Sequence, residues 1–146
     1  MYGQPAAGET LAWEWVEHQL AASGTYWVNP WRSTPPHPRP VWGIWSESTL
    51  HLSVGSPTIN RHLELGDRVT VHLPSDTDVV IVDGVVALHT TDAELIRTYD
   101  QKYDWVYDID EYGPLTSVRP SSVLSWRAAG WAGRDGFSAT GSWQFG

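Results

Sequence analysis

Six histidines and one serine-rich turn are the residues of this sequence whose types could support chemistry. The histidines are His18, His37, His51, His62, His72 and His89. A metal site needs three or four converging side chains, and no His-x-His or His-Glu-x-x-His spacing is present. A strand pair could still bring His51 and His72 together. We expect the histidines to be satisfied or surface residues, and we predict no metal site.

The turn SVGSPTINRH (53–62) is the most suggestive polar segment. Ser53, Ser56, Thr58 and Arg61 cluster at the start of an expected short helix, where backbone N–H groups and the helix dipole favour an anion. The alternative is a helix capped by Ser56 or Thr58 with a solvated Arg61, and the sequence leaves both open. Because no nucleophile elbow, Gly-x-Gly-x-x-Gly motif or Walker lysine loop occurs, catalytic residues stay unassigned.

The segment PHPRPVWGIW (36–45) combines three prolines, two tryptophans and a glycine. Alternation places Val41, Gly43 and Trp45 on one face of a strand and Trp42 and Ile44 on the other, so both faces are apolar. Prolines cannot donate ladder bonds, so the approach to this strand is an edge or a loop. The segment is either a strand beside a binding site or a proline-rich ligand for another domain.

Charge and composition limit the partners. The net charge is -8, and the nine Lys and Arg residues are scattered, which disfavours nucleic acid and anionic membranes. The absence of cysteine excludes disulfides and thiolate chemistry. No signal peptide or run of about 18 apolar residues is visible, so we predict a soluble cytoplasmic protein. Ten tryptophans exceed the needs of a small core and favour a pocket or a subunit interface.

The elements that must position these residues follow from periodicity and turn signals. The expected helices are 10–22, capped by Thr10 and ended at Gly24, a short one within 55–67, and 91–105 with a Thr91–Glu94 capping box. The expected strands are 25–29, 41–45, 50–54, 68–73, 78–90 and 117–131, the last interrupted at Pro120. Residues 30–38 and 108–111 are expected loops. Successive strands joined by tight turns predict one mainly β (α+β) domain, an antiparallel sheet curled into a barrel with flanking helices.

The order of these elements, together with several motifs, resembles the pyridoxamine 5'-phosphate oxidase-like split-barrel family, especially its short members that bind FMN or the deazaflavin coenzyme F420. The resemblance spans roughly residues 20–145. Its motifs are PHPRPVWGIW (36–45), LHLSVGSPTINRHL (50–63), DVVIVDGVVALHTTDAELIRTYDQKYDW (78–105), SVRPSSVLSW (117–126) and the terminal WQF. Their order and spacing together carry the match.

The resemblance implies an FMN-binding split β-barrel over 1–146 that works as a homodimer with cofactor clefts at the subunit interface. It assigns Pro40, Val41, Trp42 and Gly43 to the pocket of the flat ring, and a ligand is expected in the gap beside Gly43. It assigns Ser53, Thr58, Arg61 and His62 to the phosphate turn, with Arg61 as the main anion anchor, and brings Trp143 from the partner subunit. The proline-rich ligand becomes the weaker alternative.

The chain departs from the family in its cations. The phosphate turn of the family has a pattern like Ser-Arg-Lys-x-Arg-Asn-Leu, and Ile59 here replaces its lysine. The terminal Thr-Arg-Trp is replaced by Gly141, Ser142 and Trp143. Each lost charge-assisted hydrogen bond costs on the order of 1.5–3 kcal/mol. The cofactor, FMN or F420, is therefore either held weakly, changed or lost.

Two functions follow. The first is an oxidoreductase in which FMN or F420 exchanges a hydride with a small apolar or aromatic substrate, chemistry that needs no compulsory acid or base. The second is a cofactor-independent enzyme or binding protein that uses the same aromatic cleft.

Overall fold

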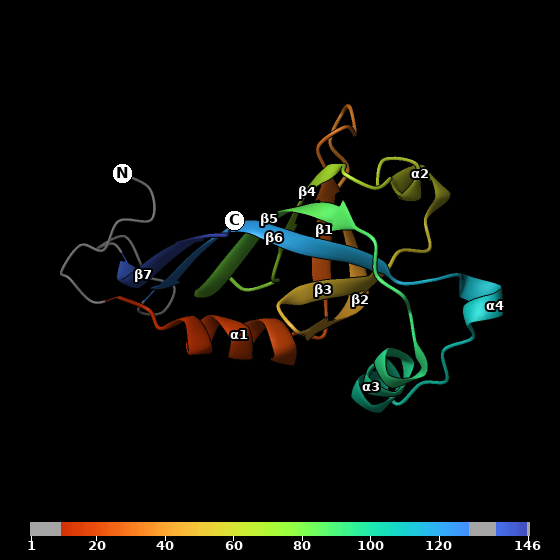
Figure 1. Cartoon of the computed structure of the whole chain (residues 1–146). Helices are drawn as coiled ribbons and strands as arrows, with labels where there is room; N and C mark the ends of the chain where they lie inside the picture. Colours follow the sequence, from red (N-terminus) through yellow and green to blue (C-terminus); the bar gives the residue numbers. More distant parts are fainter. Residues whose placement is uncertain (1–9, 129–136, 146) are drawn as a thin grey trace.

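The strands of the protein form one sheet that closes on itself (Figure 1). The structure is a computed structural model that describes residues 10–128 and 137–145. The helices are α1 Trp13–Ala22, α2 Pro57–Asn60, α3 Ala93–Tyr103 and α4 Ile109–Tyr112. The strands are β1 Tyr26–Pro30, β2 Arg39–Ser46, β3 Thr49–Ser53, β4 Arg68–His72, β5 Asp78–Ala87, β6 Thr116–Ala128 and β7 Phe137–Gln144.

The sheet order is β3-β2-β1-β4-β5-β6-β7, and a further β3–β6 pairing closes six strands into an antiparallel barrel. The long β6 makes closure possible because it pairs with β3 at its start and with β7 at its end, while β5 covers its other edge. This arrangement confirms the predicted mainly β barrel with flanking helices.

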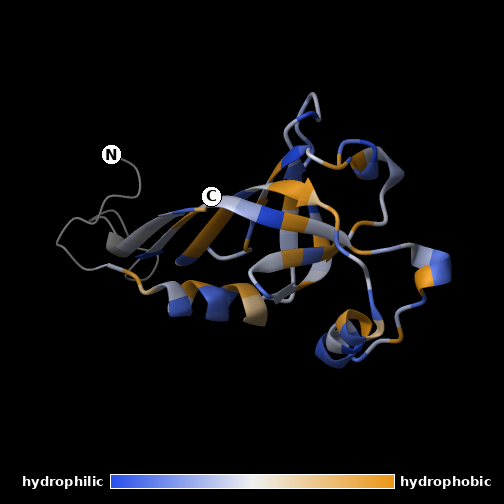
Figure 2. Cartoon of the chain, viewed as in Figure 1, coloured by the Kyte–Doolittle hydropathy of each residue, from blue (hydrophilic) through white to orange (hydrophobic). Residues whose placement is uncertain are grey.

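Alternating side chains fill the barrel. Every second residue of β5 from Val80 to Val86 is buried, and Figure 2 shows β5 as hydrophobic along most of its length. Val16 and Leu20 of α1 are fully buried against the same core, beside Tyr26. The helix therefore closes one side of the barrel through one apolar stripe.

A β-bulge takes the place of the predicted break at Pro120. The strand β6 continues through this proline, and the register with β5 shifts between Asp83 and Gly84, opposite Pro120. A Cβ on Gly84 would lie 2.6 Å from the backbone oxygen of Arg119, so the close approach requires glycine.

The ends of two helices differ from the predictions. The N-cap of α1 is Ala12, which makes no side-chain cap bond, and Thr10 instead forms an isolated bridge with Thr140. The C-cap is Ser23 in an extended conformation, so Gly24 is no left-handed cap. These errors arise because packing against the barrel, and not local capping, fixes where α1 begins and ends.

The predicted capping box of α3 is also wrong. Asp92 is the N-cap, and its carboxylate accepts the N–H of Leu95 at 2.8 Å. The hydroxyl of Thr91 instead accepts the N–H of Leu115 at 3.0 Å, which ties the start of α3 to the segment before β6. Residues 108–111, an expected loop, include most of the one-turn helix α4, and the C-terminal tail includes β7.

The two faces of β2 serve two different cores, as the alternation predicted. Val41 and Trp45 pack against the barrel core. Ile44 points the other way, into a second cluster with Leu95, Tyr99, Tyr107 and Leu115. The strand therefore joins the barrel to α3 and to the chain that follows it.

Side chains of α3 satisfy the backbone of β2 beyond its pairing with β1. The β1–β2 pairing runs only from Val28↔Arg39 to Tyr26↔Val41. Beyond it, the Gly43 N–H donates to the Tyr103 hydroxyl at 2.8 Å, and the Gly43 oxygen accepts from Lys102 Nζ at 2.8 Å. We call these bonds the Gly43 clasp. Burial lowers the pKa of Lys102 to about 8 and raises that of Tyr103 to about 12.

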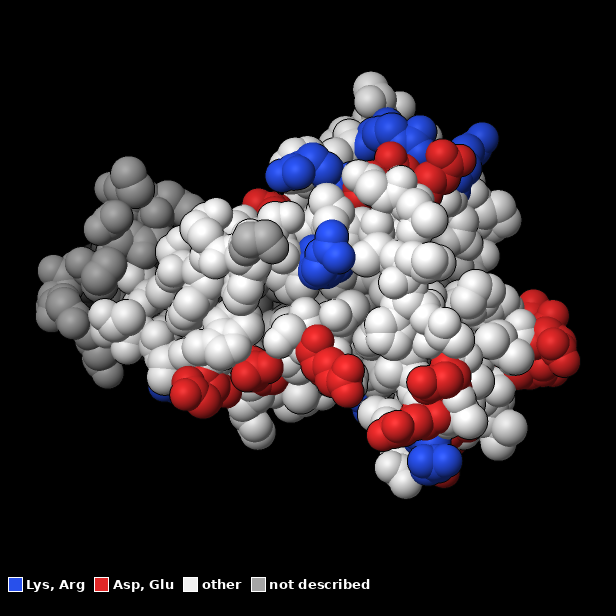
Figure 3. Space-filling model, in the orientation of Figure 1, with Lys and Arg blue, Asp and Glu red and all other residues white. Residues whose placement is uncertain are grey.

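Charged side chains are unevenly spread over the molecule. On the face shown in Figure 3, carboxylates lie over α1, α3 and α4, whereas cationic side chains gather near α2. Arg32 in the latter region pairs with Asp67 at 2.7 Å. On this face, carboxylates therefore lie mainly over the helices α1, α3 and α4.

A buried polar pair lies at the seam where β3 meets β6. His51 is 1% exposed, and its Nδ1 lies 2.8 Å from the hydroxyl oxygen of Ser117, its cross-strand partner. The ring of His89 contacts His51 edge to face at 4.6 Å. Burial, and then the nearby His89, lower the pKa of His51 to about 4.

The Gly43 clasp generates the first prediction. Tyr103→Phe removes the hydroxyl but keeps the ring, so the Gly43 N–H loses its partner, and we expect a loss of about 1–3 kcal/mol in the free energy of unfolding. Chemical denaturation measures it. Tyr112→Phe is the matched control, since Tyr112 is half exposed, and should stay within about 0.5 kcal/mol of the parent. Equal losses in the two variants would contradict the clasp.

The second prediction concerns pH. His51 stays neutral in the folded protein down to about pH 4, whereas in the unfolded chain it takes up a proton near pH 6.5. The unfolded state therefore binds more protons between these values, and stability falls as pH falls through this window, by on the order of 3 kcal/mol. Urea unfolding at several pH values should show this slope reduced in His51→Gln and retained in His37→Gln, which changes an exposed histidine. If the free energy of unfolding depended on pH equally in the parent and in His51→Gln, the assignment of this pH dependence to His51 would be wrong.

Candidate functional site

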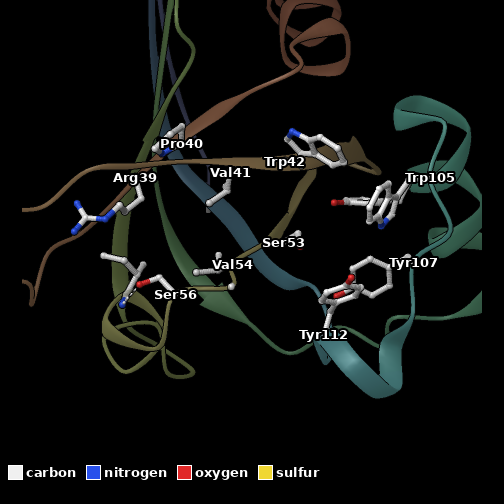
Figure 4. A pocket seen from close by; sticks show the side chains of 13 residues that line it. Arg39, Pro40, Val41, Trp42, Ser53, Val54, Ser56, Trp105, Tyr107 and Tyr112 are labelled. Carbon is white, nitrogen blue, oxygen red and sulfur yellow. Dashed lines mark hydrogen bonds between the residues drawn. The ribbon is translucent and has the colours of Figure 1, made fainter.

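A pocket of about 440 Å³ lies between β2, β3, α2 and the chain from α3 to α4 (Figure 4). Strand and turn residues form one part of its lining, and aromatic residues form the other. The lining residues are Arg39, Pro40, Val41, Trp42, Ser53, Val54, Gly55, Ser56, Ile59, Tyr99, Trp105, Tyr107 and Tyr112.

The β2–β3 hairpin builds the floor of the pocket. Trp42 pairs with Ser53 across the two strands, which places Val41, Ser53 and Val54 beside one another. Ile59 of α2 is fully buried and continues this apolar floor. The proline-rich approach to β2 ends at the pocket edge with Arg39 and Pro40.

Aromatic rings form the opposite wall. Trp42 and Trp105 meet at right angles, with ring centroids 5.8 Å apart and an interplanar angle of 88°. Tyr107 contacts Tyr99 at 5.1 Å and Tyr112 at 5.7 Å. Behind this wall, Tyr103 stacks flat on Trp42 at 4.4 Å and 1°. The Gly43 clasp therefore also fixes the position of the Trp42 ring.

The polar groups of the wall are neutral hydroxyls. Burial raises the pKa values of Tyr99 and Tyr107 above their usual range. The Tyr107 hydroxyl donates to the Gly113 oxygen, and the Tyr107 N–H donates to the Asp100 carboxylate at 2.8 Å. These bonds hold the wall in place and leave a largely apolar surface with few polar groups, which suits a flat aromatic molecule.

The turn that was the candidate anion site is a capped helix. The Ser56 hydroxyl accepts the Ile59 N–H at 3.4 Å, as the alternative for this segment predicted. Thr58 and Arg61 are exposed, and neither lines the pocket. His62 also lies outside it, with its Nδ1 buried and without a hydrogen-bond partner. The structure therefore does not bring these three residues to the pocket.

The other residues that the sequence assigned to the site fall into two groups, those that line the pocket and those that do not. Pro40, Val41, Trp42 and Ser53 line the pocket. Gly43 does not, and the gap expected beside it is already filled by protein.

A Cβ on Gly43 would lie 2.7 Å from a side-chain carbon of Leu52 and 2.8 Å from the His51 backbone oxygen. Glycine is therefore required at position 43 because neighbouring residues of the barrel fill the space beside it, and no room is left there for a ligand.

Trp143 lies on β7, where it packs against Trp13 at a centroid distance of 5.2 Å. It lines no part of this pocket. Its predicted contribution to a partner subunit's cleft, like the homodimer itself, stays a prediction.

Sequence reasoning missed more than half of the site. The lining residues that were not assigned to it are Arg39, Val54, Gly55, Ile59, Tyr99, Trp105, Tyr107 and Tyr112. A signal was present in the run YDQKYDWVYDIDEY (99–112), where aromatic residues recur without a regular helical or strand period. Such a run is typical of a wall built from a helix end and an irregular segment.

The histidines do not converge. His51 lies at the β3–β6 seam, whereas His72 stacks on Trp27 with centroids 6.2 Å apart. Within residues 10–128 and 137–145, no three His, Asp or Glu side chains form a metal-ligand set. In the same ranges, no helix is both long and apolar enough to cross a membrane.

Comparison with known proteins supports the fold. The sequence matches no protein-family model and no curated protein. One solved structure superimposes on 90% of this chain and 90% of its own with a TM-score of 0.59, at 11% identity. General stress protein 26 from Jannaschia sp. CCS1 superimposes on 82% of this chain and 80% of its own with a TM-score of 0.54, at 11% identity. The TM-scores show that the chain shares the barrel fold of these structures, which is compatible with a split barrel. Because the identities are so low, the likeness shows the fold alone.

Proposed function

We propose that the pocket binds the flat ring of FMN or F420 and that the protein is an oxidoreductase. The observation that supports this most is the meeting of β2, the strand assigned to the ring by resemblance, with a wall of aromatic side chains at one pocket. The barrel fold of the solved neighbours is compatible with the same proposal.

The lining fits the ring of such a cofactor. Trp42, Val41 and Val54 offer flat or apolar surfaces, and the neutral hydroxyl of Tyr99 can donate to a polar ring edge. When bound, the cofactor would accept or supply the hydride. The residues of this chain would hold the ring, orient a small apolar or aromatic substrate against it and exclude water.

The anionic tail of the cofactor finds fewer partners. Among the described residues, Arg39 is the one cation that lines the pocket. A charge-assisted bond from its guanidinium contributes more than a neutral one, but a single such bond holds a phosphate less firmly than several. We therefore expect the ring, more than the phosphate, to determine affinity.

The first test is titration with riboflavin, FMN and F420, followed by absorbance and tryptophan fluorescence. Trp42→Leu should weaken the binding of riboflavin by about five- to tenfold, because it removes a flat surface at the pocket. Trp31→Leu is the control, since Trp31 is also about half exposed but bonds to Thr70 outside the pocket. Equal affinity in the parent and Trp42→Leu would place the ring elsewhere.

A second test separates the two candidate anion anchors. Arg39→Gln should weaken FMN by about five- to tenfold and leave riboflavin unchanged, because only FMN has a phosphate. Arg61→Gln, which changes an exposed arginine outside the lining, should alter neither affinity. If Arg61→Gln were the variant that loses FMN, Arg61 of the phosphate turn would be the anion anchor, as the sequence predicted, and the assignment to Arg39 would be wrong.

A second candidate function rests on the same scarcity of cations. A pocket with one lining arginine and a buried isoleucine on its floor also suits an uncharged aromatic ligand without any cofactor. Binding of 2-naphthol, with no binding of riboflavin, FMN or F420, would favour this cofactor-independent protein.

A further inference from the structure

The two ends of the pocket differ in charge. Arg39 lies at one end, and Trp105, Tyr107 and Tyr112 lie at the other (Figure 4). The chain that supplies this second end, residues 99–112, carries five carboxylates: Asp100, Asp104, Asp108, Asp110 and Glu111. None of the lining residues is a carboxylate, but the segment that forms this second end of the pocket is acidic, whereas the first end carries Arg39.

In the part of the chain that the structure describes, no ion pair balances the carboxylates of this segment. Lys102 is the only cationic residue in 99–112, and its ammonium group points to the Tyr26 hydroxyl and the Gly43 oxygen, each 2.8 Å away. The ion pairs found among the described residues join Arg32 to Glu64 and Asp67, and Arg127 to Asp78, so none of them uses these carboxylates. Figure 3 shows carboxylates gathered where α4 lies.

Four rings at this end face different directions around one space. They are Trp42, Trp105, Tyr107 and Tyr112, and we call them the cage. Trp42 and Trp105 stand at 88° to each other, and Tyr107 and Tyr112 at 43°. Trp42, Trp105 and Tyr112 remain 42%, 45% and 50% exposed, so a ligand can reach them. Tyr103 covers one face of Trp42, and Tyr107 is buried behind the more exposed rings.

We propose that the substrate of this pocket carries a positive charge, as an alkylated ammonium group, and that the cage binds it. The inference rests on the proposed function in that it concerns the substrate of the same pocket. The face of an aromatic ring attracts a cation through its quadrupole, and several rings at different angles surround an ammonium group without a hydrogen bond. A neutral group of equal shape gains the contact but not this attraction.

The carboxylates of residues 99–112, which we call the rim, add negative charge to the segment that carries three of the four cage rings. Asp108 already accepts the N–H groups of Asp110 and Glu111 as the cap of α4, and Asp100 accepts the Tyr107 N–H. These bonds fix the Asp108 and Asp100 side chains to the segment that carries Tyr107 and Tyr112. An anionic group at this end would meet the same charges as repulsion, so the acidic rim selects against it.

The test uses three probes of similar shape and different charge. They are 4-hydroxyphenyl-trimethylammonium, its neutral isostere 4-tert-butylphenol and the anion 4-hydroxybenzoate, each titrated against the full chain by tryptophan fluorescence. We expect the ammonium probe to bind at least about fivefold more tightly than the neutral isostere, and the anion to bind most weakly. The preference should shrink as salt is raised, because the rim carboxylates are exposed.

Two pairs of variants locate the effect. Trp105→Leu should remove most of the preference for the ammonium probe, whereas Trp31→Leu should keep it. Asp110→Asn combined with Glu111→Gln should reduce the preference about twofold, whereas Glu14→Gln on the distant α1 should not. Thermal unfolding of each variant shows that it is folded.

The outcomes separate this inference from the proposed function. A preference for the ammonium probe that depends on Trp105 supports the cage, whether or not riboflavin binds in the parallel titration. Equal or tighter binding of the neutral isostere, no binding of any probe, or a preference that survives Trp105→Leu overturns the cage. Flavin binding without ammonium preference would leave the oxidoreductase proposal standing and refute this one alone.

Discussion

The hydrogen bonds that hold α3 to β2 converge on the backbone of one residue, Gly43. The β1–β2 pairing stops at Tyr26↔Val41, so the N–H and the carbonyl of Gly43 find no partner in β1. A backbone group left unpaired away from water costs about as much as a lost hydrogen bond, and Tyr103 and Lys102 satisfy both groups from the helix. Only glycine fits here, because Leu52 and the His51 backbone already occupy the space of a side chain. The sequence suggested that Gly43 leaves space for a ligand, but in the structure Gly43 is where α3 is joined to β2.

The pocket is a consequence of that junction. Once α3 is held against β2, the chain that leaves it must return to β6, and this connection carries Trp105, Tyr107 and Tyr112 past the open edge of the hairpin. The second apolar cluster, built from Ile44, Leu95, Tyr99, Tyr107 and Leu115, fills the space behind it. The barrel core and this cluster share only β2, so the pocket lies between two packed bodies and is lined by residues from both. Pockets at such boundaries are a common place for ligands.

Sequence patterns predicted the barrel well because each strand has a local signature. Alternation in β2 and β4 and the continuous apolar run of β5, with tight turns between neighbours, predict the strands and the hairpins. Closure by β6 was less visible, since Pro120 suggests a break where the strand makes a bulge opposite Gly84. The aromatic wall was missed because its residues follow no single period and converge only after α3 has docked. The site was thus predicted where it lies on strands and missed where tertiary contacts bring it together.

The α2 turn shows why a shared fold does not determine a shared ligand. In the family that this chain resembles, a lysine of this turn holds phosphate, whereas Ile59 at that position is fully buried in the barrel core and lines the pocket. Burying an isoleucine contributes roughly 1.5–3 kcal/mol to stability, so α2 is held to the barrel by an apolar contact where the family places a cation. The same replacement removes positive charge from the pocket, and the acidic segment 99–112 shifts the balance further. The pocket of this chain therefore combines a largely apolar, aromatic lining with few of the features that favour an anion, and this combination is the basis of our proposal on the charge of its ligand.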